Sequence, residues 1–120
     1  MKNNIAVACL LVLLVTGCSS VSDAGYYWGN YAGTLYSYQK DPSPESLAQH
    51  EEELKGIVEY SNENTLKVPP GIFAELGFIE QRRGNEALSR GYYEQEMAVY
   101  PESRLFLERI SSDVSSEGGE

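Results

Sequence analysis

Few side chains of this chain have the chemistry of a catalytic or metal-binding residue. His50 is the only histidine, and the run Glu51-Glu52-Glu53 follows it directly. A catalytic zinc site usually takes three protein ligands, with more than one histidine or cysteine among them, whereas a His-x-x-Glu pair offers two. We therefore interpret His50 as a histidine at the rim of an apolar helix face, next to solvated glutamates. This interpretation predicts no metal, no other cofactor and no catalytic residue.

An enzyme is the third hypothesis for function, after a protein adaptor and a glycan-binding module. The chain contains no P-loop, Gly-x-Ser-x-Gly, His-Glu-x-x-His or dinucleotide-binding motif. A deep pocket in which Glu51 or Glu53 converges on His50 would favour an enzyme, whereas a solvent-open His50 would not. From the residues we predict a non-enzymatic protein.

The second reactive group is the thiol of Cys18, which follows an apolar N-terminal segment. Lys2 precedes an unbroken apolar run at residues 5–15, which is shorter than the ~20 residues of a membrane-spanning helix. A basic start, a short apolar run and small residues are typical of a secretory signal. The sequence Val15-Thr16-Gly17-Cys18 resembles the lipobox of bacterial lipoproteins.

This resemblance implies that residues 1–17 are a signal peptide and that cleavage precedes Cys18. It further implies that the Cys18 thiol carries a diacylglyceryl group and that its new α-amino group is acylated, which is enough for stable membrane anchoring. Ser19 follows the cysteine where an Asp would resemble an inner-membrane retention signal, so the resemblance implies the outer membrane, facing the periplasm. Cys9 is lost with the signal peptide, and no disulfide is expected.

The charge balance argues against one class of partner. The chain has 9 Lys+Arg against 18 Asp+Glu, a formal net charge of -9. Loss of Lys2 with the signal peptide would make the mature protein one unit more negative. Nucleic acids and anionic membrane surfaces attract proteins with an excess of lysine and arginine. We therefore predict no nucleic-acid partner, and we expect the lipid anchor rather than surface charge to hold the protein at a membrane.

Apolar residues between 26 and 110 recur at helical spacing, which predicts an all-α domain. The expected helices are about 26–39, 44–62, 71–83, 86–100 and a short C-terminal capping helix near 105–110. Ser43 and Pro44 are favourable at a helix start, and Gly84-Asn85 predicts a tight turn. Residues 18–25 are expected to be the lipidated cysteine and its tether, and 111–120 a disordered acidic tail.

Aromatic residues crowd into the first predicted helix. Six of them fall within thirteen positions, and one helix face cannot bury them all: Tyr26, Tyr27, Trp28, Tyr31, Tyr36 and Tyr38. We predict that Tyr27, Trp28, Tyr31 and Tyr36 contribute to a surface that packs on another envelope protein or on a second copy of this chain. The alternatives are that the rings fill the core, or that they stack on glycans.

Residues 70–103 resemble one tetratricopeptide repeat (TPR), a 34-residue helix–turn–helix unit. The residues that carry the resemblance are Leu76, Gly77, Gly84, Tyr93 and Pro101. In such a unit Gly77 would let the paired helices approach closely, while Tyr93 would fill the core of the hairpin. The resemblance implies two TPR-like helical hairpins followed by the capping helix, with residues 26–61 as the first hairpin.

A longer pattern resembles a family of short bacterial lipoproteins whose TPR-like domain is labelled only as a domain of unknown function. The pattern is Tyr27-Trp28-Gly29-x-Tyr31, Leu35-Tyr36, Pro69-Pro70-Gly71, Ala74-Glu75-Leu76-Gly77, Glu96, Tyr100-Pro101-Glu102-Ser103 and Phe106. In that family the gene often lies beside genes for a CsgG-like outer-membrane lipoprotein and another small lipoprotein. The resemblance therefore implies an adaptor in an envelope assembly with CsgG-like partners. The alternative function is a glycan or peptidoglycan-binding module that uses the aromatic cluster.

Overall fold

The computed structural model describes residues 25–117, with side chains as far as Ser112. The predicted signal peptide, the predicted lipidation site Cys18 and the tether up to residue 24 lie outside the described residues. Within the described part of the chain, all regular secondary structure is helical, which confirms the predicted all-α class. No helix in this part is both long and apolar enough to cross a bilayer.

Five α-helices and one short 3-10 turn make up the described chain. Their bounds are α2 Tyr31–Lys40, α3 Pro44–Glu63, α4 Ile72–Arg82, α5 Glu86–Val99, η1 Pro101–Ser103 and α6 Arg104–Glu117. The bounds of α3, α4 and α5 confirm the predicted helices to within one residue. At the start of α3, the Ser43 hydroxyl accepts a hydrogen bond from the Ser46 N–H, as predicted for an N-cap.

Helix α2 begins later than predicted. The sequence predicts a helix from Tyr26, but the helix starts at Tyr31. Gly29 has a φ of +47°, in the left-handed region, and breaks the helical backbone there. The Glu53 carboxylate of α3 accepts a hydrogen bond from the Asn30 N–H at 2.6 Å and holds the new start in place. The aromatic residues Tyr26, Tyr27 and Trp28 therefore lie on an extended segment that leads into α2.

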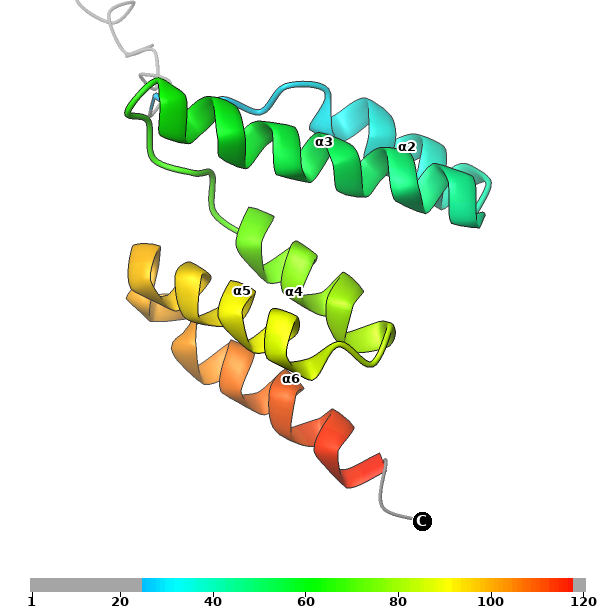
Figure 1. The fold of residues 1–120 in the computed structure, drawn as a ribbon, viewed down its shortest axis with the longest axis vertical. Coiled ribbons are helices and arrows are strands. Elements are labelled where there is room, and N and C mark those ends of the chain that lie inside the picture. The colour runs from blue at the N-terminus through cyan, green and yellow to red at the C-terminus, as the bar shows by residue number, and fades with distance from the viewer. Residues whose placement is uncertain (1–24, 118–120) are drawn as a thin grey trace, which may run out of the picture.

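The helices form two antiparallel hairpins and a final helix (Figure 1). Helix α2 packs against α3, α4 packs against α5, and α6 packs against α5. In Figure 1 the turns of both hairpins lie on the right, and the link from α3 to α4 crosses on the left. The buried apolar core lies where α3 meets α4, and its members are Leu54, Ile57, Val68, Ile72, Phe73, Leu76 and Ile79.

The α4–α5 hairpin depends on one close helix contact. A Cβ placed on Gly77 would lie 2.6 Å from two atoms of the Tyr93 ring, so only glycine fits. This agrees with the predicted close approach at Gly77 and with Tyr93 in the hairpin core, where it is 3% exposed. The Tyr93 hydroxyl donates to Gln81 Oε1 at 2.6 Å. Gly84, with a φ of +81°, makes the predicted turn.

The link between the hairpins is held by one side chain of the last turn of α5 and by Tyr100, the residue that follows this helix. The Tyr100 hydroxyl donates to the Val68 carbonyl at 2.6 Å. The Glu96 carboxylate, 3% exposed, accepts from the Gly71 N–H at 2.7 Å and the Ala74 N–H at 3.3 Å. These N–H groups open α4 and have no partner within the helix, so Glu96 acts as a cap supplied from another helix.

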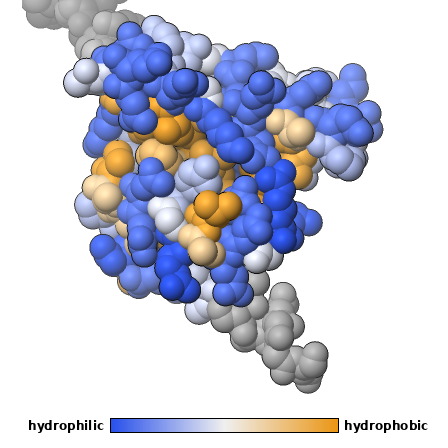
Figure 2. All heavy atoms as spheres, viewed as in Figure 1, coloured by the Kyte–Doolittle hydropathy of each residue, from blue (hydrophilic) through white to orange (hydrophobic). Residues whose placement is uncertain are grey.

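Apolar side chains line the space between α3 and α5, and Val58 and Tyr92 are the half-buried ones among them. Figure 2 shows apolar residues gathered in the middle of this face, framed by hydrophilic ones. A groove of about 410 Å³ lies there, with Val58, Phe73, Leu76 and Tyr92 among its lining residues.

The C-terminal helix is longer than predicted. The sequence predicts a disordered tail from residue 111, whereas α6 continues to Glu117. The Ser111 and Ser112 hydroxyls donate to the carbonyls of Glu108 and Arg109, three residues earlier. Serine thereby meets its hydrogen-bonding needs inside the helix, so a serine-rich segment need not end it.

Candidate functional site

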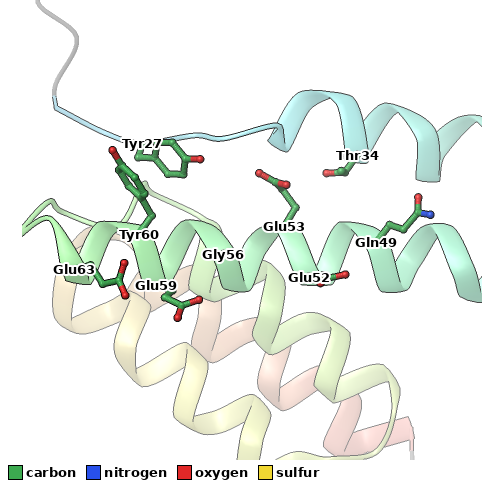
Figure 3. Close-up of a pocket in the computed structure, with 9 residues that line it drawn as sticks. All are labelled: Tyr27, Thr34, Gln49, Glu52, Glu53, Gly56, Glu59, Tyr60 and Glu63. Atoms are coloured by element: carbon green, nitrogen blue, oxygen red, sulfur yellow. The ribbon is translucent and has the colours of Figure 1, made fainter.

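A groove of about 570 Å³ runs along α3 beside the segment that leads into α2 (Figure 3). Its residues come from that segment, from α2 and from most of the length of α3. They are Tyr27, Thr34, Gln49, Glu52, Glu53, Gly56, Glu59, Tyr60 and Glu63. We call it the acidic groove, because four of its nine lining residues are glutamates and none is basic.

The floor of the acidic groove follows one stripe of α3. Glu52, Gly56, Glu59 and Glu63 are spaced by three or four residues, which places them along one face of the helix. A Cβ on Gly56 would have no atom within 4 Å, so the missing side chain leaves the middle of the floor hollow. The groove therefore leaves space above Gly56 for a bound chain or side chain.

The carboxylates of the acidic groove differ in their partners. Glu53 turns toward the start of α2, where it caps the Asn30 N–H (Figure 3). Glu52, Glu59 and Glu63 form no ion pair within the described residues. Glu59 and Glu63 are four residues apart, a spacing at which like charges repel. A cation bound between them would relieve this repulsion.

One end of the acidic groove is aromatic. The rings of Tyr27 and Tyr60 stack with their centroids 3.8 Å apart and their planes 26° from parallel (Figure 3). Tyr60 keeps 42% of its surface exposed. The face of a tyrosine ring attracts ammonium and guanidinium groups. This end of the groove can therefore contact both the aliphatic stem and the charged head of a lysine or arginine.

The structure brings together three of the four predicted partner-binding residues. The rings of Trp28 and Tyr31 meet edge to face with their centroids 5.5 Å apart, and Tyr27 lies on the same segment. Trp28 is 41% exposed, while Tyr27 and Tyr31 are half-buried. Tyr36 is 63% exposed but lies about 140° around α2 from Tyr31, with its ring near Lys40. That these residues bind a partner stays a prediction.

Tyr60 is an aromatic residue of this site that the sequence analysis missed. It belongs to α3, thirty-three residues after its stacking partner Tyr27. On α3 it lies beside the exposed Glu59. An exposed tyrosine on a charged helix face is a weak signal, and only the packing of the hairpin shows its partner.

His50 is buried, and its interpretation as a rim histidine is wrong. The side chain is 1% exposed. Its Nδ1 lies 2.8 Å from Thr34 Oγ1 on α2, and its Nε2 lies 2.7 Å from Glu75 Oε1 on α4. Both ring nitrogens thus have partners on neighbouring helices, which compensates for the burial of a polar ring.

A chain of hydrogen bonds continues from Glu75 back to α2. The Tyr31 hydroxyl donates to Glu75 Oε2 at 2.9 Å. Burial, together with this bond to a carboxylate, raises the pKa of Tyr31 to about 12, so the phenol stays a donor. Thr34, His50, Glu75 and Tyr31 thereby join three helices. Neither Glu51 nor Glu53 converges on His50, which was the arrangement that would have favoured an enzyme.

Glu51 is also buried, although the sequence predicted a solvated glutamate. It is 7% exposed and pairs with Lys55 at 2.6 Å and with Arg83 at the end of α4. Arg83 also pairs with Glu80 at 3.2 Å, and the Asn85 amide donates to Glu80 at 2.6 Å. The hydrogen bond from Arg83 and the nearby Lys55 charge lower the pKa of Glu51 to about 2. This cluster joins the first hairpin to the turn of the second.

No group of three or more metal-binding side chains occurs in the described part of the chain. Cys18, the predicted lipidation site, is outside that part. The prediction that the protein has no metal or other cofactor stays a prediction.

Comparison with known proteins shows similarity to one protein family. No curated protein and no solved structure shows significant similarity to this chain. The family model of DUF4810, a domain of unknown function, matches residues 26–110, a range that holds both hairpins and most of the aromatic, acidic and buried polar residues described above. This chain therefore belongs to the DUF4810 family.

Proposed function

We propose that this protein is an outer-membrane lipoprotein that acts as a non-enzymatic adaptor in a cell-envelope protein assembly. In this proposal Cys18 carries the lipid, the helical domain faces the periplasm, and the acidic groove with its aromatic end binds a partner protein. The proposed partners are other envelope lipoproteins, CsgG-like ones among them, in line with the resemblance of the longer sequence pattern.

The observation that supports this proposal is the composition of the acidic groove. Four glutamates line a groove of about 570 Å³ that has no basic residue of its own. Charge complementarity between surfaces favours a partner segment that carries lysine or arginine. The stack of Tyr27 on Tyr60 offers apolar contact for the stems of such side chains. We therefore expect a basic, extended segment of the partner to lie along α3.

The surroundings of His50 favour an adaptor over an enzyme. A general base must come within reach of a substrate proton, and the His50 ring is only 1% exposed. Both nitrogens of the buried His50 ring are already engaged by Thr34 and Glu75. The imidazole therefore serves to join helices.

A glycan-binding module is the second candidate, because Trp28 and Tyr36 keep 41% and 63% of their surfaces exposed. Sugar rings stack on exposed aromatic faces. Tyr27 and Tyr60 each cover one face of the other's ring, so these two faces are not open to a sugar. We place this candidate second for that reason.

Co-purification of the tagged full chain from solubilised membranes tests the adaptor proposal. We expect envelope proteins to co-purify after mild crosslinking. The double variant Glu59→Gln and Glu63→Gln should lower their recovery about tenfold, because each lost charge contact in a solvated groove is worth ~0.5–1 kcal/mol. The matched control is Glu94→Gln with Glu102→Gln, two exposed glutamates outside the groove.

Equal losses in the two double variants would contradict a role for the acidic groove. Recovery of peptidoglycan without envelope proteins would favour the glycan module, and a Trp28→Ala variant should then lose that binding. Recovery of neither would contradict both candidates.

A further inference from the structure

A second pocket, of about 380 Å³, lies where α2, α3 and α4 meet. It shares no lining residue with the acidic groove. Its walls are apolar side chains from all three helices, namely Leu35, Tyr38, Leu47, Phe78 and Ile79. We call it the three-helix pocket. Its volume lies within the ~300–1,000 Å³ of small-molecule sites.

The polar groups of this pocket are of two kinds. The pair of buried His50 and partly exposed Glu75 is the first, with 27% of the Glu75 side chain exposed. Each Glu75 oxygen already accepts one hydrogen bond, from His50 or from Tyr31. A carboxylate has about four acceptor sites, so Glu75 can accept a further donor from the pocket.

The second kind is cationic. Arg82 and Arg83 both line the pocket. Arg83 is occupied by Glu51 and Glu80. The Arg82 guanidinium lies 5.8 Å from the centre of the Phe78 ring and has no ion pair within the described residues. Arg82 is exposed, so its guanidinium is accessible to an anion that enters the pocket.

We propose that the three-helix pocket binds a small carboxylic acid with an apolar body and a hydrogen-bond donor at its far end. The carboxylate would pair with Arg82, the body would lie among the apolar walls, and the donor would reach Glu75. A hydrophobic pocket with a few separated polar groups fixes the orientation of its ligand in this way. A plain apolar molecule fits less well, because it would remove water from Glu75 without replacing it.

The probe is 3-(4-hydroxyphenyl)propanoate, titrated into the purified full chain by calorimetry. Two analogues each lack one end: 3-phenylpropanoate has no donor, and 4-ethylphenol has no carboxylate. We expect saturable binding of the probe and ~3–10-fold weaker binding of each analogue, the range for one partly solvated hydrogen bond or ion pair.

Variants of Arg82 test whether this residue binds the carboxylate of the probe. Arg82→Gln should weaken the probe ~3–10-fold and leave 4-ethylphenol unchanged, whereas Arg82→Lys should restore part of the loss. Arg109→Gln, an exposed arginine of α6, removes the same charge away from the pocket and should change nothing. Circular dichroism checks that each variant is folded.

Three results would overturn this proposal: no saturable binding of the probe to the folded chain, equal weakening by Arg82→Gln and Arg109→Gln, or equal affinity for the probe and both analogues. Because the two sites share no residue, the acidic groove can fail its own test without affecting this one.

Discussion

At the scale of single residues, the buried charged and polar side chains decide which helices meet. Glu51, Glu80, Glu96 and His50 are all buried. Burying such a group without a partner is unfavourable, and each of these has partners. His50 joins α2 to α4, Glu51 joins α3 to the end of α4, and Glu96 joins α5 to the start of α4.

Glu51 should make stability depend on pH. Its pKa in the folded protein is about 2, against an ordinary value of 4.5, because Arg83 and Lys55 bind the charged form. A lowered pKa contributes stability above about pH 4.5, and this contribution is lost as the pH falls toward 2. The full shift corresponds to at most ~3 kcal/mol. Because Lys55 and Arg83 are partly exposed, we expect ~1–2 kcal/mol.

Urea unfolding of the wild type and of Glu51→Gln at a series of pH values measures this contribution. The free energies of unfolding should differ by ~1–2 kcal/mol near neutral pH and converge below about pH 2. Glu52→Gln, at the exposed neighbouring position, should stay within ~0.5 kcal/mol of the wild type. A difference that persists unchanged at low pH would show that Glu51 acts through packing rather than charge.

At the scale of elements, local signals predicted most helix ends, whereas partners far apart in sequence escaped prediction. Ser43 and Pro44 marked the start of α3, and Gly84 marked the turn after α4, because capping and left-handed backbone are local properties. Gly29 broke α2 within an apparently periodic stretch. Hydrophobic periodicity treats every glutamate as solvated, so it cannot distinguish buried Glu51 from exposed Glu52.

Only some residues of the candidate sites could be predicted from the sequence. The aromatic cluster was visible because its members are neighbours in sequence. Tyr60, Glu75 and Arg82 were not recognised as site residues, because each depends on packing against a distant helix.

Replacing either of two glycines in the α4–α5 hairpin by alanine should change stability in opposite directions. Gly77→Ala would put a methyl group 2.6 Å from the Tyr93 ring and 3.2 Å from the Ser89 carbonyl. We expect it to destabilise the protein by ~1–3 kcal/mol through overpacking. Gly91→Ala, within α5 and with no atom within 4 Å of the new Cβ, should stabilise it by ~0.5–1 kcal/mol.

Thermal unfolding followed by circular dichroism compares the two glycine variants. Opposite signs are expected. If both substitutions raised the melting temperature, the helices would not approach at Gly77 as closely as described.

At the scale of the whole molecule, the helical domain presents two chemically different sites on one small scaffold. The acidic groove lies along α3 in the hairpin of α2 and α3, and the three-helix pocket lies where both hairpins meet. A ligand in the three-helix pocket would contact Leu35 and Leu47 on one hairpin and Phe78 on the other. Binding there would therefore stabilise the angle between the hairpins, on which the exposed groove between α3 and α5 also depends.

The proposed attachment to a membrane depends on the lipid at Cys18, because surface charge cannot supply it. A formal net charge of -9 repels anionic lipid, and no described helix is suited to span a bilayer. If the protein is a lipoprotein, the acyl chains on Cys18 must provide the anchoring free energy.

Cys18→Ala should therefore move the protein from the membrane fraction to the soluble fraction. Cys9→Ala, in the same N-terminal segment, should leave it with the membranes. Mass spectrometry of the mature wild type should show loss of residues 1–17 and addition of lipid. Retention of Cys18→Ala in the membrane fraction would contradict the lipid anchor, and with it the envelope adaptor in the form proposed above.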